Sequence, residues 1–487
     1  MERNRIKTPE AFKEEFSEMR LGESIILKTR IEKDSLGEME IQENIYYGIQ
    51  TQRALCNFPV SGHRERPELV RAYILIKKAA AIANMELGAL DRERGNAIVA
   101  AAEEVLSDPA GKYSDQFPVD VFQAGAGTSF NMNINEVLAN RALEIMGRKR
   151  GDYDFLSPND HVNRAQSTND TFPTASYIAI IFAADRLLDV LASLSGAFQA
   201  KAREFSGIPK SGRTHLMDAV PVTLGDEFGA YSAALLRASR RIKERRDDLL
   251  ELPLGGTATG TGANTYPGYR ELVISKLSEL CKLPFRRADN SFEALQSRSQ
   301  LAAFSGALRE LALELIRIAN DLRLLNAGPT TGISEIELPP VQPGSSMMPG
   351  KYNPVMAECL DMIGFQIVGN DTAVALAAQA GQLELNVMTP VMTSNVLVSI
   401  ALLTNYLPVF QERCVKGIKA HEDRCRNYLK LNPILVTFLA PKIGYIKAAE
   451  IAKEVLEKKM SVKEVVLMKG ILSKEEADEL LKIEKLL

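Results

Sequence analysis

The segment GSSMMPGKYNP, residues 344–354, combines hydroxyls, a cation and an amide on a stretch rich in glycine and proline. Ser345 and Ser346 stand a few residues before Lys351 and Asn353. A serine hydroxyl acts as a base only when its surroundings stabilise the alkoxide, and backbone N–H groups or a lysine can do so. No GxSxG pattern of a serine hydrolase surrounds these serines. The segment therefore indicates proton abstraction from a carbon next to a carboxylate.

Three further segments interrupt the apolar pattern with small uncharged polar residues: QAGAGTSFNMNINE (123–136), NDHVNRAQSTNDTFPTA (159–175) and GRTHLMDAVPVTLG (212–225). Their candidate hydrogen-bond donors are Thr128, Ser129, Ser167, Thr168, Asn169 and Thr214. Such donors at helix starts suit a bound carboxylate, because helix N-termini also present free N–H groups. Each cluster alone is more typical of N-caps and turns, which Ser, Thr and Asn form in many proteins. Four polar segments in one chain favour a binding site.

The histidines and one glycine-rich stretch are weaker candidates for a functional site. His215 follows Thr214 inside a polar cluster, whereas His63, His161 and His421 are isolated, so no metal site is expected. The glycine-rich stretch GGTATGTGANT (255–265) lacks the GK[ST] ending of a phosphate loop and is predicted to be a turn between helices.

Composition excludes several classes of protein. The 487 residues carry a formal net charge of -3 and no tryptophan, which argues against nucleic-acid binding. Five scattered cysteines fit a reducing cytoplasm. The apolar run YIAIIFAA ends at Asp185, well short of about 20 residues, so no membrane span is expected. The chain is thus expected to be a cytoplasmic protein that binds neither nucleic acid nor membrane.

Long helices must position these polar segments. Apolar periodicity predicts helices over 175–205, 222–250, 304–325 and 391–419. The helix over 304–325 is apolar on two faces, so it needs neighbours on both sides, which favours an oligomer of bundles over a single large monomeric bundle. Strands are predicted only near 38–42 and 343–348.

These elements suggest three domains behind an extension. Residues 1–29 form a charged N-terminal extension, 30–166 an N-terminal domain, 167–424 a central helical-bundle domain, and 425–487 a small C-terminal helical domain. Two S-x-x-E capping boxes, at Ser461 and Ser473, mark helix starts in the last domain.

The segment GSSMMPGKYNP resembles the signature loop GSSxMPxKxNP of the aspartase/fumarase superfamily, and the other three clusters resemble its remaining signature regions. The resemblance runs from about Arg30 to the C-terminus in the same order. Within the superfamily, GAGTSFNMNINEVLANRALE, DAVPVTLGDEF and GNDTAVALAAQAGQLELNVM are most similar to aspartate ammonia-lyases. The resemblance implies a mainly α, three-domain aspartase/fumarase fold. It also implies that a long central helical bundle assembles into a 20-helix homotetramer core, with each active site shared by three subunits.

The resemblance also implies a role for each site residue. Ser345 is the general base, taking a proton from Cβ of L-aspartate to form an enediolate-like aci-carboxylate, after which ammonia leaves and fumarate remains. Three groups of residues hold the substrate: Thr128, Ser167, Thr168 and Ser346 at the carboxylate next to Cβ, Lys351 and Asn353 at the other carboxylate, and Asn169, Thr214 and His215 at the amino group. Glu358 pairs with His215, and Ser345, His215 and Lys351 form the catalytic set. No cofactor is implied, because the substrate's own carboxylate is the electron sink.

Two other functions stay open at this point. One is class II fumarase activity, the hydration of fumarate to malate, and the other is a non-catalytic role, as in some lens crystallins. Retention of Ser345, Lys351 and Asn353 disfavours the non-catalytic role. The sequence departs from the family in its N-terminal extension, at Met347, at Tyr352 and at Thr389, where aspartases often have glutamate.

Overall fold

The computed structural model describes residues 28–108 and 111–482, so most of the predicted N-terminal extension lies outside the described residues. The chain divides into two compact units, the second of which includes short insertions from earlier in the sequence. Among the described residues, the first unit comprises 28–65, Lys77–Ala124 and Thr128–Arg164, and the second comprises Arg66–Ile76, Gly125–Gly127 and 165–482. The predicted three-domain boundaries remain a prediction.

The first unit combines one antiparallel hairpin with short and medium helices. Its elements are β1 (Thr29–Asp34), β2 (Gly37–Gln42), α2 (Ile49–Asn57), the later part of α3 (Pro67–Glu86), α4 (Arg92–Ser107) and α5 (Thr128–Ile145). The predicted strand at 38–42 is confirmed as part of β2. Buried Glu136 on α5 accepts N–H bonds from Gly48, Gln50 and Thr51, and so caps the start of α2.

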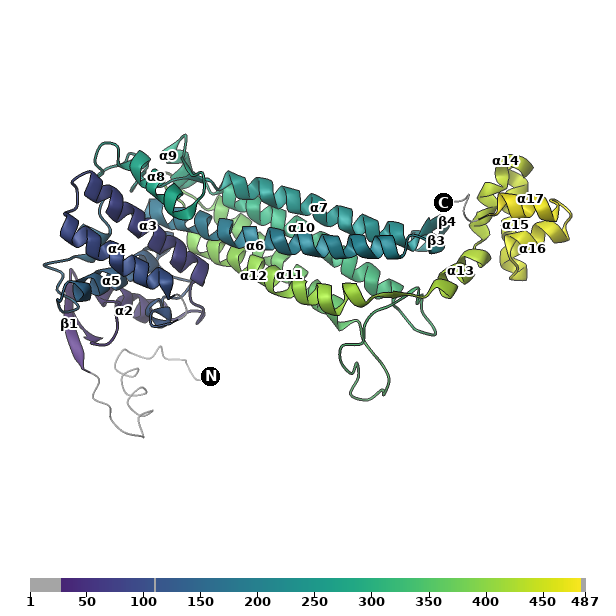
Figure 1. Ribbon diagram of the computed structural model, residues 1–487, viewed down its shortest axis with the longest axis horizontal. Helices are drawn as coiled ribbons and strands as arrows, with labels where there is room; N and C mark the ends of the chain where they lie inside the picture. Colours follow the sequence, from purple (N-terminus) through teal and green to yellow (C-terminus); the bar gives the residue numbers. More distant parts are fainter. Residues whose placement is uncertain (1–27, 109–110, 483–487) are drawn as a thin grey trace, which may run out of the picture. The chain divides into compact units, whose positions relative to one another are not determined.

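The second unit is built on long helices that run side by side (Figure 1). They are α6 (Thr168–Glu204), α7 (Leu224–Asp248), α10 (Ser299–Leu325), α11 (Val355–Gln379) and α12 (Thr389–Arg413). Capping boxes start two of them, Ser167 with Asp170 for α6 and Thr223 with Asp226 for α7. The four predicted long helices are confirmed. Because its capping box lies within the second polar cluster, α6 begins earlier than the apolar periodicity indicated.

Helix α10 has the two apolar faces that its sequence predicts. It packs against α7 on one side and α11 on the other, with Leu308, Leu311, Leu315 and Leu322 almost fully buried. Further apolar side chains of these helices stay exposed in one chain, including Leu313, Met362 and Phe365. The mainly α fold class is therefore confirmed, and part of the bundle surface is apolar.

Helix α12 and the turn that follows, Thr389–Gly417, have the length and hydropathy of a membrane-spanning helix. Its contacts in the structure are those of a bundle helix, since it packs against α6 and α11. The buried Thr393 and Ser399 on α12 are hydrogen bonded to Ser176 on α6 and Asn370 on α11, at 2.7 and 3.0 Å.

Short strands and small helices complete the second unit. The antiparallel hairpin β3 (Pro209–Thr214) and β4 (Met217–Thr223) joins α6 to α7. The remaining short elements are β5 (Glu251–Leu252), α8 (Tyr269–Cys281), β6 (Arg286–Arg287), α9 (Ser291–Gln296), β7 (Ile336–Glu337) and β8 (Lys419–Ala420). The strand predicted at 343–348 is wrong, because that segment is irregular. It follows prolines and closes on itself as a loop.

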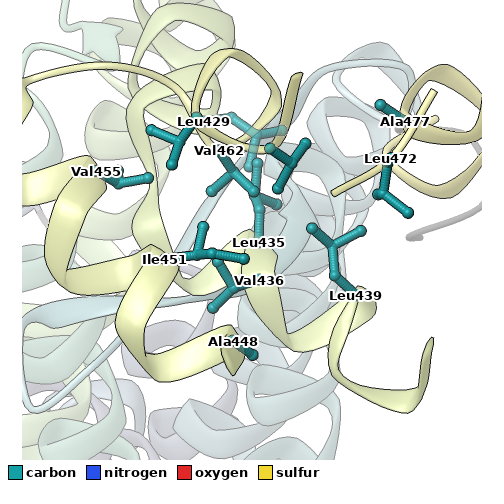
Figure 2. Close-up of a cluster of buried hydrophobic side chains, with 12 residues drawn as sticks. Leu429, Leu435, Val436, Leu439, Ala448, Ile451, Val455, Val462, Leu472 and Ala477 are labelled. Carbon is teal, nitrogen blue, oxygen red and sulfur yellow. The ribbon is translucent and has the colours of Figure 1, made fainter. Parts of the chain in front are cut away.

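The C-terminal helices enclose a hydrophobic cluster of their own (Figure 2). They are α13 (Glu422–Leu431), α14 (Ala440–Ile443), α15 (Tyr445–Lys458), α16 (Val462–Met468) and α17 (Lys474–Leu480). Leu439, Ile451 and Val465 are at most 1% exposed in this cluster. The predicted capping boxes are confirmed, since Ser461 starts α16 and Ser473 starts α17.

Candidate active site

The loop before α11 is closed into a ring by two hydrogen bonds. The Gly344 N–H donates to the Lys351 carbonyl at 2.8 Å, and the Asn353 Nδ2 donates to the Gly344 carbonyl at 2.5 Å. A Cβ at Gly344 would lie 2.3 Å from the Lys351 oxygen, so only glycine permits this closure. The Asn353 side chain thus holds the two ends of the loop together, in addition to any contact with substrate.

Inside this ring the Ser345 hydroxyl lies among backbone donors. Its Oγ accepts N–H bonds from Met347 at 3.2 Å and from Met348 at 2.9 Å. Hydrogen bonds to an oxygen favour its charged form, so both donors lower the cost of forming an alkoxide at Ser345. The same two bonds also hold the turn of the loop around Ser345.

Thr214 and His215 lie at the tip of the β3–β4 hairpin and are exposed. The two central residues of the turn, His215 and Leu216, have φ of 54° and 61°. Tight hairpin turns need positive φ at both positions, which glycine and asparagine adopt most easily. A histidine and a leucine there store backbone strain, and such strain concentrates at functional sites.

Ser167, Thr168 and Asn169 form the start of α6, where backbone N–H groups have no partner within the helix. Asp170, which the sequence analysis missed, fixes this end. Its Oδ1 accepts from the Ser167 N–H, and its Oδ2 accepts from the N–H groups of Gly255 and Thr257, both at 2.9 Å. The capping box S-T-N-D was the available sequence signal.

The stretch 255–265 is an irregular connection, as predicted, and lies between α7 and α8 with the two-residue strand β5 just before it. It also supports the site, since the Asn169 Nδ2 donates to the Ala258 carbonyl at 2.8 Å. The connection therefore orients one of the predicted substrate ligands.

Thr128 is the first residue of α5 and is exposed. The two residues before it, Ala126 and Gly127, have φ of 61° and 88°. A Cβ at Gly127 would lie 1.9 Å from the Phe172 ring, so this position requires glycine. The tight turn places the start of α5 beside the Thr128 hydroxyl, which suits a carboxylate, although the Phe130 N–H of this first turn already donates to the Gln123 side-chain oxygen at 2.9 Å.

A hollow of about 360 Å³ in the first unit opens beside Thr128. Its lining includes Gln50, Arg53 and Asp34. The Arg53 guanidinium binds Asp34 through two nitrogens, at 2.7 and 2.9 Å, and this hydrogen bonding lowers the pKa of Asp34. The charge of Arg53 is therefore already matched by a carboxylate.

One chain does not bring all these groups together. Helix α6 has 37 residues, so at about 1.5 Å per residue it places roughly 55 Å between Ser167 and the hairpin beyond its other end. Ser345 follows Glu335 by ten residues, and Glu335 is bound to Arg213 of that hairpin. Ten residues reach at most about 35 Å, so Ser345 and Ser167 of one chain stay about 20 Å apart or more.

Two further predictions concern Glu358 and metal ions. Glu358 lies in the first turn of α11, and within the described residues it has no hydrogen bond or ion pair with His215. In the same part of the chain, no group of three or more His, Cys, Asp or Glu side chains is arranged to hold a metal ion.

The sequence of the chain matches known families of lyases. The pattern of the family described as "Lyase" matches residues 37–369, and that of "Fumarase C C-terminus" matches residues 435–487. The chain is 48% identical to aspartate ammonia-lyase of Bacillus subtilis, over 92% of this chain and 94% of that protein. It is 45% identical to aspartate ammonia-lyase of Escherichia coli strain K12, over 94% and 96%.

Solved structures agree with the sequence relatives. A fumarate lyase:delta crystallin from Brucella melitensis bound to cobalt is 46% identical, with a TM-score of 0.91 over 94% of this chain and 100% of that one. A class II fumarase from Schistosoma mansoni is 36% identical, with a TM-score of 0.89 over 94% and 98%. The chain therefore belongs to the aspartase/fumarase superfamily of lyases and, within it, to the aspartate ammonia-lyase family.

Proposed function

We propose that the chain is a carbon-nitrogen lyase that reversibly converts L-aspartate to fumarate and ammonia, by anti elimination through an aci-carboxylate intermediate. The observation that carries the proposal is the Ser345 hydroxyl, which two backbone N–H groups prepare for loss of its proton. Relatives that are 45–48% identical over nearly the whole chain support aspartate as the substrate.

The chemistry follows from where charge develops. When Ser345 removes the Cβ proton, a second negative charge develops on the adjacent carboxylate. Hydroxyls and helix N-termini that bind this group stabilise the intermediate more than the substrate, and only such differential binding speeds the step. The residues proposed for this role are Thr128, Ser167, Thr168 and Ser346.

The other end of the substrate needs charge and orientation. Lys351, exposed on the loop, supplies a cation for the second carboxylate, and Asn353 lies beside it in the closed ring. Asn169, Thr214 and His215 are proposed to face the amino group, with Glu358 behind His215. No cofactor enters this scheme, because the substrate's carboxylate accepts the electron pair.

We propose a homotetramer in which each active site draws on three subunits. The separation of Ser167 and Ser345 within one chain supports this assembly, since a four-carbon dicarboxylate is far shorter than that gap. Apolar side chains around the catalytic groups point the same way, because Met347 is 81% and Leu216 70% exposed in one chain. Four copies of the five bundle helices give 4 × 5 = 20 helices in the shared core.

We further propose a cytoplasmic location. The five cysteines have no disulfide partner within the described residues, and Cys414 and Cys425 are buried in the second unit. Unpaired thiols of this kind suit a reducing compartment.

The test is the ultraviolet absorbance of fumarate formed from L-aspartate, compared with that formed from L-malate under the same conditions. We expect fumarate from L-aspartate and little from L-malate. Faster turnover of malate would reject the aspartase assignment and favour the fumarase alternative. No turnover of either, by a folded tetramer, would favour a non-catalytic role.

A further inference from the structure

The stem of the β3–β4 hairpin contains a buried ion network that the proposed reaction does not use directly. Glu335, which is fully buried, accepts from Arg213 through both carboxylate oxygens at 2.9 Å and from Lys210 at 2.8 Å. Lys210, 1% exposed, also binds Glu227 of α7 at 2.7 Å. Lys210 and Glu335 are buried, whereas Arg213 and Glu227 are partly exposed. Burying a charged group is costly unless it is paired, so the Lys210–Glu335 centre of the network is under geometric constraint.

The backbone of Glu335 is fixed on both sides. Its N–H donates to the Leu325 carbonyl at the end of α10, and its carbonyl accepts from the His421 N–H at 2.9 Å. The carboxylate is thus attached to the bundle, and Arg213 is attached to the carboxylate by a two-point contact. Such a bidentate contact fixes orientation as well as distance.

The local structure of the strand aims Arg213 at this carboxylate. The pairing of β3 and β4 shifts register between Ser211 and Arg213. A bulge of this kind redirects the side chains that follow it. Gly212 permits the bulge, because a Cβ there would lie 2.6 Å from the Val220 carbonyl. Asn432 of the C-terminal helices holds the hairpin at Ser211 and at the Ala219 carbonyl, at 2.5 and 2.7 Å.

Arg213 is the residue directly before Thr214, and the strained turn at His215 and Leu216 follows at once. A turn of this kind keeps its conformation only when its surroundings hold it. The tip is exposed in one chain, so within the chain the constraint on the turn comes from the stem.

We propose that Arg213 and Glu335 are positioning residues, whose bidentate ion pair holds the hairpin so that Thr214 and His215 face the amino group of the substrate. The inference rests on the proposed function. It adds that the ion network at the hairpin stem orients the leaving amino group. Binding of the two substrate carboxylates does not depend on this network.

The variant that tests the inference is Arg213→Lys, which keeps the positive charge and removes the two-point contact. Glu335 keeps Lys210 as a partner in this variant, so no buried carboxylate is left without a cation. The matched control is Arg246→Lys. Arg246 makes the same kind of two-point contact, to Asp185 at 2.8 and 2.7 Å, between α6 and α7 and away from the hairpin.

Kinetics are measured on the refolded or native tetramer in both directions. For Arg213→Lys we expect kcat/KM for L-aspartate to fall by about tenfold or more, since small displacements of positioning groups have effects of this size. In the reverse reaction the KM for ammonia should rise, while the KM for fumarate and inhibition by succinate, which lacks the amino group, should stay close to wild type. Arg246→Lys should leave all of these values near wild type.

The outcomes separate this inference from the proposed function. A wild-type protein that does not deaminate aspartate rejects the proposed function before any variant is made. If the wild type is active, three results overturn the inference: Arg213→Lys with unchanged kinetics, equal losses in both lysine variants, or a parallel loss of fumarate and succinate binding. Failure of Arg213→Lys to fold or assemble also overturns it, because the pair would then hold the fold rather than the hairpin.

Discussion

The separation of Ser167 and Ser345 within one chain makes a quantitative prediction about mixed oligomers. Helix α6 and the reach of the segment from Glu335 to Ser345 keep the two side chains about 20 Å apart or more. If both residues serve one active site, as we propose, that site takes Ser167 from one chain and Ser345 from another. The perturbation is to mix two variants, Ser167→Ala and Ser345→Ala, each of which damages all sites of its own tetramer.

The expected recovery follows from random mixing. In an equal mixture, a given site receives an intact Ser167 from half of the chains and an intact Ser345 from half of the chains. A site is intact when both conditions hold, so about a quarter of the wild-type activity should return. The two variants are unfolded and refolded together, and formation of fumarate from L-aspartate is followed by absorbance. Each variant refolded alone gives the baseline.

The contrary result is equally definite. If each site were built within one chain, every chain in the mixture would carry a mutation in its own site and mixing would restore nothing. Baseline activity, in a mixture whose subunits are shown by differently tagged chains to have exchanged, would refute the argument from helix length. Because Ser167 caps α6, its replacement costs about 1 kcal/mol of stability. Circular dichroism of the refolded variant checks that the fold survives.

Three other predictions test individual groups. Ser345→Ala should lower kcat by about 10² to 10⁴ while the KM for aspartate changes little, and a variant with near wild-type kcat would exclude Ser345 as the base. Lys351→Ala should raise the KM for aspartate and lower kcat together, since it removes a charge partner of the dianion; steady-state kinetics with unchanged KM would contradict this role. Burial, together with the charge of Asp120, raises the pKa of Glu65 to about 8. The folded state therefore holds the Glu65 proton more tightly than the unfolded state, in which the pKa is about 4.3. The stability that this proton contributes is fully present below about pH 4.3 and is lost as the pH rises through about 8. Glu65→Gln should therefore match wild type in thermal melts near pH 5 and exceed it near pH 9 by on the order of 4 kcal/mol; equal stability at both pH values would count against a protonated Glu65.

Local patterns in the sequence determined the elements of the fold. The leucine spacing of residues 308–325 predicted a helix with two apolar faces, and α10 packs on two sides as expected. The boxes at Ser461 and Ser473 predicted helix starts that the structure confirms. These features depend on residues three or four positions apart, which lie on one turn of a helix, so the sequence contains the whole interaction.

The four polar segments were long enough to indicate the protein family from the sequence. The segment 344–354 and the three other clusters carried enough residues in a fixed order to indicate the aspartase/fumarase superfamily, which the relatives confirm. One local prediction was wrong: among the described residues no strand pairs with the segment 343–348, which closes on itself through the Gly344 and Lys351 backbones. A strand needs a partner in space, and a short window of sequence does not specify one.

Tertiary structure alone decided how the site residues are supported. Asp170 binds the N–H groups of Gly255 and Thr257, 85 and 87 positions away, and Arg213 binds Glu335 across 122 positions. Neither partner can be inferred from spacing, because the packing of α6, α7 and α10 brings these segments together. The same packing sets Ser167 and the hairpin at opposite ends of α6. The sequence therefore supplied the candidate site residues, whereas the length of a helix, which a sequence motif does not contain, decided how far apart they lie within one chain.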